Sequence, residues 1–157
     1  MYGIETEITS DSGGGLNIGY THPGDYVDYL VEVEADYEYD IKLRIAAESN
    51  SGRVVFYAVS DQGEETRLSE ILLPVTNGWQ NWVNVTSSIQ LPKGNYTLRM
   101  KVINGDCNMN WIELSYPDSD QDGINDTIDQ CPNTSVISSV DQYGNYSFSN
   151  YSGIILD

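Results

Sequence analysis

The sequence predicts an all-β protein folded as a β-sandwich. Apolar and polar residues alternate in many short runs, such as residues 26–33, where Val27, Tyr29, Val31 and Val33 share one face. Turn signals rich in Gly, Pro and Asn separate these runs, and no stretch has a convincing helical period. Each strand is therefore apolar on one face and must pack against a second sheet. A jelly-roll connection fits this pattern, which does not by itself determine the topology.

The expected strands are short and follow one another closely. A first alternating run precedes the flexible segment Ser12-Gly13-Gly14-Gly15, and Pro23-Gly24 marks the turn into the second run. Asp61-Gln62-Gly63-Glu64 is a hairpin-type turn, and Asn77-Gly78 is a turn that presents Trp79. We expect strands over residues 4–8, 26–33, 41–47, 54–59, 68–75, 82–86, 96–102 and 108–114. The sandwich then occupies residues 1–116, and residues 117–157 form a separate acidic segment.

Composition and charge restrict the function. The 157 residues suffice for one domain with an appendage, and the aromatic residues are 12 Tyr and 3 Trp against 2 Phe. Tyr and Trp favour wet interfaces, although any single tyrosine can equally be an ordinary strand residue. The net charge of −17 argues against nucleic acids, acidic membranes and polyanionic ligands, which leaves neutral ligands and divalent cations. No apolar run reaches membrane-spanning length, and the first residues are not a signal peptide. Because the chain starts abruptly and its last residues complete no motif, we expect an excised fragment with an added Met1.

The stretch from Tyr20 to Tyr29 carries the first candidate ligand-binding residues. Tyr20 lies on the loop before a predicted strand, where an aromatic ring has little core to join. Tyr26 begins that strand, and alternation places its side chain on the side that faces water. Two rings turned outward on one short segment favour stacking against a flat, weakly polar ligand such as a sugar ring.

Two groups of acidic residues are candidate calcium ligands. Glu5 and Glu7 point to the same side of the first strand, where either a Ca²⁺ ion or plain solvation could relieve their repulsion. In residues 118–129, acidic residues occupy relative positions 1, 3, 5, 9 and 12 with Gly at position 6, which is the spacing of a Ca²⁺-binding loop. The ligands expected there are Asp118, Asp120, Asp122, the carbonyl of Ile124, Asp126 and Asp129. A disordered acidic linker is the alternative.

The chain resembles the family 6 carbohydrate-binding modules. The resemblance spans residues 4–115 in chain order and is carried by residues 4–7, 17–20, 24–29, 43–46, 76–80, 94–98 and 108–112. It implies a jelly-roll sandwich that binds glycans in a cleft formed by loops at one end. It also implies that Tyr20 from the first loop and Trp79 from a later loop hold a sugar ring, while Asn108 hydrogen-bonds the sugar hydroxyls.

The same resemblance implies a second binding site and a structural metal. Some members bind glycan on a sheet face through an aromatic residue at the position of Tyr26, where the family more often has Trp. Alternation places Asp28, Trp111 and Glu113 on outward faces as well, so we assign them to this possible second site. The family also carries a structural Ca²⁺ near its first and last strands, and the matching positions are Glu5, Glu7 and Asn110.

Residues 118–135 resemble a thrombospondin type 3 repeat, through the Asp-rich loop and the Cys131-Pro132-Asn133-Thr134 that follows it. Such repeats link modules in secreted bacterial enzymes that degrade polysaccharides. The usual partner of the repeat's cysteine is missing, because Asn145 stands where that partner is expected. Cys131 therefore either pairs with Cys107 or is free.

These features predict a non-catalytic, secreted (extracellular, bacterial) module that directs a glycoside hydrolase to neutral β-linked polysaccharide. The expected ligand is laminarin-like β-1,3-glucan, followed by agarose and then xylan. The expected partners are this polysaccharide or its oligosaccharides and a covalently linked catalytic domain, with no nucleic acid and no membrane. A calcium-dependent adhesion or spacer module is the alternative. A glycoside-active enzyme is a weaker alternative, since no carboxylate pair stands out and His22 has no plausible nucleophile partner.

Overall fold

The computed structural model describes residues 4–49, 51–120, 124–126 and 128–129. The chain divides into two compact units, Met1–Ser115 and Tyr116–Asp157, which are described separately. Within the described residues of the first unit the strands are β1 (Glu5–Ile8), β2 (Leu16–Gly19), β3 (Tyr26–Val33), β4 (Tyr37–Ala46), β5 (Gly52–Val59), β6 (Glu65–Leu73), β7 (Val83–Leu91), β8 (Gly94–Asn104) and β9 (Asn108–Ser115). Across these described ranges there is no helix of the length and apolarity that crossing a membrane requires.

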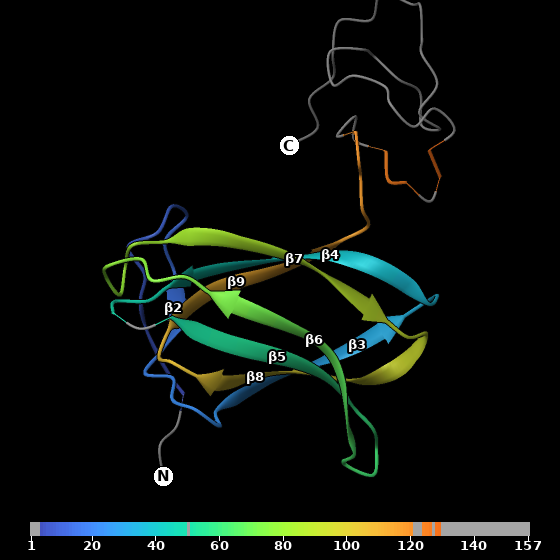
Figure 1. Cartoon of the computed structure of the whole chain (residues 1–157), viewed down its shortest axis with the longest axis horizontal. Helices are drawn as coiled ribbons and strands as arrows, with labels where there is room; N and C mark the ends of the chain where they lie inside the picture. The colour runs from blue at the N-terminus through green and yellow to red at the C-terminus, as the bar shows by residue number, and fades with distance from the viewer. Residues whose placement is uncertain (1–3, 50, 121–123, 127, 130–157) are drawn as a thin grey trace, which may run out of the picture. The chain divides into compact units, whose positions relative to one another are not determined.

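The strands form two antiparallel sheets packed face to face (Figure 1). One sheet has the order β1-β2-β9-β4-β7 and the other has the order β3-β8-β5-β6. Among the described strands, β1 and β2 and then β5 and β6 are consecutive neighbours in one sheet, and every other connection crosses between the sheets. This connection is that of a jelly roll. The predicted all-β sandwich is confirmed.

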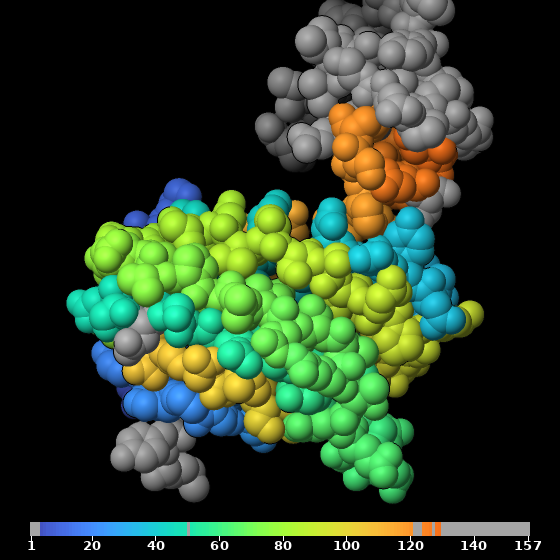
Figure 2. Space-filling model, in the orientation of Figure 1, coloured from blue at the N-terminus to red at the C-terminus, as the bar shows by residue number. Residues whose placement is uncertain are grey.

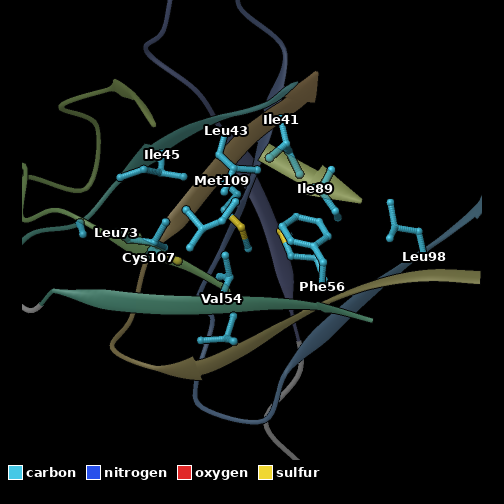
Figure 3. Close-up of a cluster of buried hydrophobic side chains, with 14 of the residues drawn as sticks. Ile41, Leu43, Ile45, Val54, Phe56, Leu73, Ile89, Leu98, Cys107 and Met109 are labelled. Carbon is cyan, nitrogen blue, oxygen red and sulfur yellow. The ribbon is translucent and has the colours of Figure 1, made fainter. Parts of the chain in front are cut away.

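The core lies between the two sheets and is built from the alternating apolar residues of both. Phe56, Ile41 and Leu43 are fully buried there, together with Met100 from β8. Figure 3 shows the side chains of β4 reaching toward those of β5 across the space between the sheets. The apolar faces that the alternation predicted are therefore the faces that pack.

Two strands differ most from the expectation. β2 was not expected as a strand, because its four residues follow three glycines and are too few to show alternation. It pairs with β1, with Glu7 opposite Asn17. β7 continues to Leu91 and passes the expected end at Thr86, because β4 offers a pairing partner along its whole length.

A β-bulge in β9 decides where its polar residues point. Arg44 of β4 pairs with Trp111 and the next residue, Ile45, pairs with Met109, so Asn110 is an extra residue in β9. Met109 is buried in the core, whereas Trp111 stands on the outer face beside Arg44. Without the bulge the two side chains would share one face.

The loops that follow β2, β4, β6 and β8 gather at one end of the sandwich (Figure 1). Hydrogen bonds join them: the Thr76 N–H donates to the Ala47 carbonyl over 2.8 Å, and Thr21 contacts Cys107. In Figure 2 the turn between β5 and β6, in green, projects at the other end. The loop end therefore brings together residues that are far apart in the sequence.

Candidate ligand-binding cleft

A cleft of about 300 Å³ opens at the loop end of the sandwich. It is lined by Glu7, Tyr20, Thr21, His22, Trp79, Asp106 and Asn108. The three residues that the resemblance assigned to a sugar site thus line one cleft. Its charged lining is acidic, and among the described residues no Lys or Arg contributes to it. The volume is at the low end of small-molecule sites.

Tyr20 is held outward by an unusual backbone conformation at the end of β2. Its φ is +56°, in the left-handed region that a bulky residue adopts only at some energetic cost. The Nδ1 atom of His22 lies 2.8 Å from the Tyr20 carbonyl oxygen, and the His22 N–H donates to Asp25 over 2.9 Å. The Tyr20 side chain is 59% exposed. The loop therefore fixes the backbone while its ring stays open to a ligand.

Trp79 is presented by a loop that side chains hold in shape. The Asn81 amide donates to the carbonyls of Thr76 and Asn77, over 3.2 and 2.9 Å. Asn77 has a φ of +59°, and a Cβ on Gly78 would lie 2.8 Å from the Asn81 amide nitrogen. The Asn77-Gly78 turn expected from the sequence is thus required by both conformation and space. It leaves Trp79 39% exposed at the cleft.

A buried threonine joins the Tyr20 loop to the start of β9. The Thr21 hydroxyl donates to the Cys107 carbonyl over 2.6 Å and accepts from the Cys107 N–H over 3.0 Å. The Cys107 side chain is 1% exposed and free, among core residues that include Leu73 and Val54 (Figure 3). Burial raises the pKa of the Cys107 thiol to about 11, so it stays protonated at neutral pH. Cys131 lies outside the described residues.

Thr21→Val is expected to lower the free energy of unfolding by about 1–3 kcal/mol. Valine keeps the shape but leaves the buried Cys107 N–H and carbonyl without the hydroxyl that satisfies them. Urea unfolding followed by tryptophan fluorescence measures the loss. Thr21→Ser keeps the hydroxyl and serves as the control. A loss in Thr21→Ser as large as that in Thr21→Val would contradict the prediction, because the hydroxyl would then contribute no more than the methyl group.

Glu7 lies on the floor of the cleft, at the centre of an amide network. Its Oε1 atom accepts hydrogen bonds from the side-chain amides of Asn17, Gln80 and Asn108, over 3.2, 3.0 and 2.6 Å. The Asn108 amide also donates to the Trp79 carbonyl over 2.8 Å. Glu7 was expected only as a metal ligand, and its place in the cleft was not predicted. The prediction failed because β2 was not recognised as a strand. The pairing of β2 with β1 sets Glu7 opposite Asn17.

Binding of a structural calcium ion by Glu5, Glu7 and Asn110 stays a prediction, and two of these residues have partners within the protein. The Glu7 carboxylate already accepts three amide donors, and the Asn110 amide donates to Asp11 over 2.9 Å. Asn110 therefore serves a different carboxylate from Glu7, because it is the bulge residue of β9. Among the described residues, no group of three or more His, Cys, Asp or Glu side chains is arranged to hold a metal ion.

Asp11 ties the β1–β2 hairpin to the neighbouring strands. Arg44 donates to both of its carboxylate oxygens, over 2.8 and 2.7 Å, and Asn110 donates to one of them. The hydrogen bond from Arg44 holds the pKa of the Asp11 carboxyl well below its usual range. This hairpin carries Glu7, so the Asp11–Arg44 pair also supports the cleft floor.

The stability contributed by Asp11 is expected to disappear in acid. Its pKa is lower in the folded than in the unfolded chain, so the contribution is complete above the unfolded value near 3.8 and is lost as the pH falls below it. Asp11→Asn should therefore melt about 5 °C below the unmodified protein at pH 7. That gap should narrow between about pH 4 and pH 2. A constant gap across thermal melts in this range would contradict the assignment.

The predicted second binding site on a sheet face is wrong, because its four residues lie on two different sheets and cannot form a single site. Tyr26 and Asp28 belong to β3, whereas Trp111 and Glu113 belong to β9. The Arg99 guanidinium lies 3.9 Å from the centre of the Tyr26 ring and donates to both Asp28 oxygens over 2.7 Å. One face of that ring is therefore occupied by a neighbour. Glu113 pairs with Lys42 on the outer face of the other sheet.

The acidic segment is described only in part. The Asp126 carboxylate accepts from the Ser119 N–H and hydroxyl, each over 2.8 Å, and the Asp126 N–H donates to the Pro117 carbonyl. These bonds join Asp126 to residues 117 and 119. Asp122 lies outside the described residues, so calcium binding by this segment stays a prediction.

The comparisons with known proteins agree with this fold. Residues 1–116 match the sequence model of the family described as carbohydrate binding module (family 6). The chain belongs to this family. It is thus a carbohydrate-binding module and not an enzyme. The predicted thrombospondin-like repeat beyond residue 116 lies outside this match.

Solved structures of the family resemble this module. A β-1,3-glucan-binding family 6 module from Bacillus halodurans is 36% identical, with a TM-score of 0.64 over 73% of this chain and 87% of that one. A module from Cellvibrio mixtus lichenase 5A in complex with cellotriose is 29% identical, with a TM-score of 0.67 over 74% and 88%. The β-agarase AgaA of Microbulbifer thermotolerans is 33% identical over 62% of this chain and 22% of the agarase. The module spans between 10% and 22% of the lengths of the curated relatives that it matches.

Proposed function

We propose that the module binds the ends of neutral β-linked polysaccharide chains in the loop-end cleft. The observation that carries the proposal is that two exposed aromatic rings, Tyr20 and Trp79, line the same small cleft as Glu7 and Asn108. Sugar rings have apolar C–H faces that stack on aromatic rings and hydroxyls that need polar partners. A cleft of about 300 Å³ suits a short chain end better than an extended chain.

Laminarin-like β-1,3-glucan is our first choice of ligand, followed by agarose and then xylan. The B. halodurans module, at 36% identity, binds β-1,3-glucan, and the C. mixtus module holds a β-linked glucose trimer. The similarity to a β-agarase supports agarose as the second choice. The acidic cleft lining disfavours sulfated and uronate-rich chains, because like charges repel.

Isothermal titration with laminaritriose, neoagarotetraose and xylotriose tests the ligand. We expect laminaritriose to bind most tightly and with a weak affinity, since a small exposed site must also order a flexible chain. Native gels cast with and without laminarin give an independent readout of binding to the polymer. If neoagarotetraose bound most tightly, agarose and not laminarin would be the ligand. If none of the three oligosaccharides bound, the proposed function would be refuted.

We also propose that the module belongs to a secreted bacterial enzyme that degrades polysaccharides. A weak binding site gains avidity when it is linked to a catalytic domain acting on the same polymer. The small share of the relatives' lengths that the module spans supports this setting. The test compares a catalytic domain from such an enzyme, with and without this module fused to it, on insoluble and soluble substrate. We expect the module to raise the rate at which the insoluble substrate is degraded and to leave the rate on the soluble substrate unchanged.

Calcium binding by residues 118–129 is a further part of the proposal. Asp118, Asp120, Asp126 and Asp129 would supply carboxylate oxygens, the ligands that Ca²⁺ prefers. The ion would brace this segment and not touch the sugar. Titration with Ca²⁺, followed by calorimetry, should show binding that Asp126→Asn weakens. Sugar binding that disappears in EGTA would instead favour the calcium-dependent adhesion alternative.

A further inference from the structure

The amide groups on the cleft floor have orientations that their backbone neighbours fix. The Trp79 carbonyl can only accept, so the atom that Asn108 turns toward it is the amide nitrogen. The Ser10 N–H and the Trp82 indole N–H can only donate, over 2.7 and 3.2 Å, so Gln80 presents its oxygen to them. Gln80 must then turn its nitrogen toward Glu7. The direction of each hydrogen bond in the network is thereby determined.

Every amide hydrogen in this network is already used inside the protein. Asn108 donates to Glu7 and to Trp79, and Gln80 donates to Glu7 and to Asn17. The Asn17 amide donates to Glu7 and to the carbonyl of Ile18, over 3.2 and 3.1 Å. An amide nitrogen has two hydrogens, so the three amides have none left to offer a ligand.

The Thr21 side chain, which also lines the cleft, has its hydrogen used inside the protein in the same way. The Thr21 hydroxyl hydrogen is donated to the Cys107 carbonyl. The atoms of Glu7 and Asn108 outside the network are oxygens: Oε2 of the carboxylate and Oδ1 of the amide. A Cβ on Gly19 would lie 3.2 Å from that Asn108 oxygen and 3.4 Å from Oε1 of Glu7, so the glycine leaves room beside the network. Glu7, Thr21 and Asn108, the lining residues that form the cleft floor, therefore offer only acceptors to a ligand.

We propose that the cleft floor selects ligands by the hydrogens they donate. It binds a sugar ring through hydroxyl hydrogens, tolerates an ammonium group in place of a hydroxyl, and rejects a group that only accepts, such as a fluorine, a methyl ether or a sulfate ester. The physical reason is that two oxygens facing an acceptor-only group are left unsatisfied on binding. This inference rests on the proposed function and defines the class of chain end that the cleft takes.

Derivatives of laminaritriose, or of xylotriose if that trimer binds instead, test the proposal by titration calorimetry. Hydroxyls of the terminal rings are replaced one at a time by fluorine, which cannot donate, or by an amino group, which is protonated and only donates. Fluorine is small, so a loss cannot be attributed to bulk. Salt at about 1 M reduces the Debye length to about 3 Å, which suppresses the general attraction of this acidic protein for an ammonium group.

At one or more positions we expect fluorine to weaken binding at least tenfold while the amino group keeps the affinity within threefold. Three results would overturn the inference. The amino derivatives could bind more weakly than the fluoro derivatives, both could bind as well as the unmodified trimer, or both could lose affinity equally. Failure of the unmodified trimers to bind would appear before any derivative is tested, and it would refute the proposed function along with this inference.

Glu7→Gln provides the matching test on the protein. Its side-chain oxygen must still face the three amide donors, so its new amide nitrogen would turn toward the cleft and offer hydrogens. The affinity for the fluoro derivative, divided by the affinity for the amino derivative, should then rise at least fivefold. Glu32→Gln removes the same charge from an exposed position on β3 and should leave the ratio unchanged. An unchanged ratio in Glu7→Gln would contradict the proposed role of the carboxylate.

Discussion

Replacement of Trp79 by alanine is expected to lower the affinity for the oligosaccharide by about 70-fold. The exposed 39% of this side chain, about 100 Å² of mostly apolar surface, would be covered by a stacked sugar ring. At about 25 cal/mol per Å² this burial stabilises the complex by about 2.5 kcal/mol. Titration calorimetry of the variant measures the loss, and thermal melting checks that the fold is kept.

Trp111→Ala is the matched control for this experiment. Trp111 is 38% exposed, almost the same fraction as Trp79, but it stands on the outer face of the five-stranded sheet and does not line the cleft. Its removal should leave oligosaccharide binding within about twofold. If the two variants lost affinity equally, the sugar would not be held in the loop-end cleft.

Gly105→Ala is expected to destabilise the protein by about 3 kcal/mol. A Cβ at this position would lie 2.6 Å from the Gly52 Cα atom and 2.8 Å from the Ser51 carbonyl oxygen, and both are backbone atoms. The φ of Gly105 is +73°, which adds strain for any residue with a side chain. The loop would have to move, and it leads directly to Asp106 and Asn108 in the cleft. Both the unfolding free energy and the sugar affinity should fall.

Gly63→Ala separates the steric clash from the backbone strain. Gly63 has a φ of +81° in the turn between β5 and β6, yet a Cβ there meets no atom within 4 Å. This variant should lose only about 1 kcal/mol, measured by urea unfolding, and should bind sugar normally. Equal losses at the two glycines would show that conformation alone, and not the close approach of two loops, limits position 105.

The family resemblance implied that Tyr20, Trp79 and Asn108 share one cleft, and turn residues in the sequence predicted the loops that present the two aromatic rings. Asn77-Gly78 marks the loop that presents Trp79, and Pro23-Gly24 marks the loop after Tyr20. Glu7 could not be placed in the same way. Its neighbours Asn17, Gln80 and Asn108 come from three separate parts of the chain, and only strand pairing brings them to one carboxylate.

The sequence by itself determined the all-β class, the apolar faces of the long strands and the exposure of Tyr20 and Trp79. Those properties depend on alternation and on turn residues, which act over a few neighbouring positions. Only the tertiary structure decided the sheet to which each strand belongs, which separated Tyr26 from Trp111. It also decided the direction of the hydrogen bonds around Glu7, because an amide can be oriented only by the fixed donors and acceptors that folding places beside it.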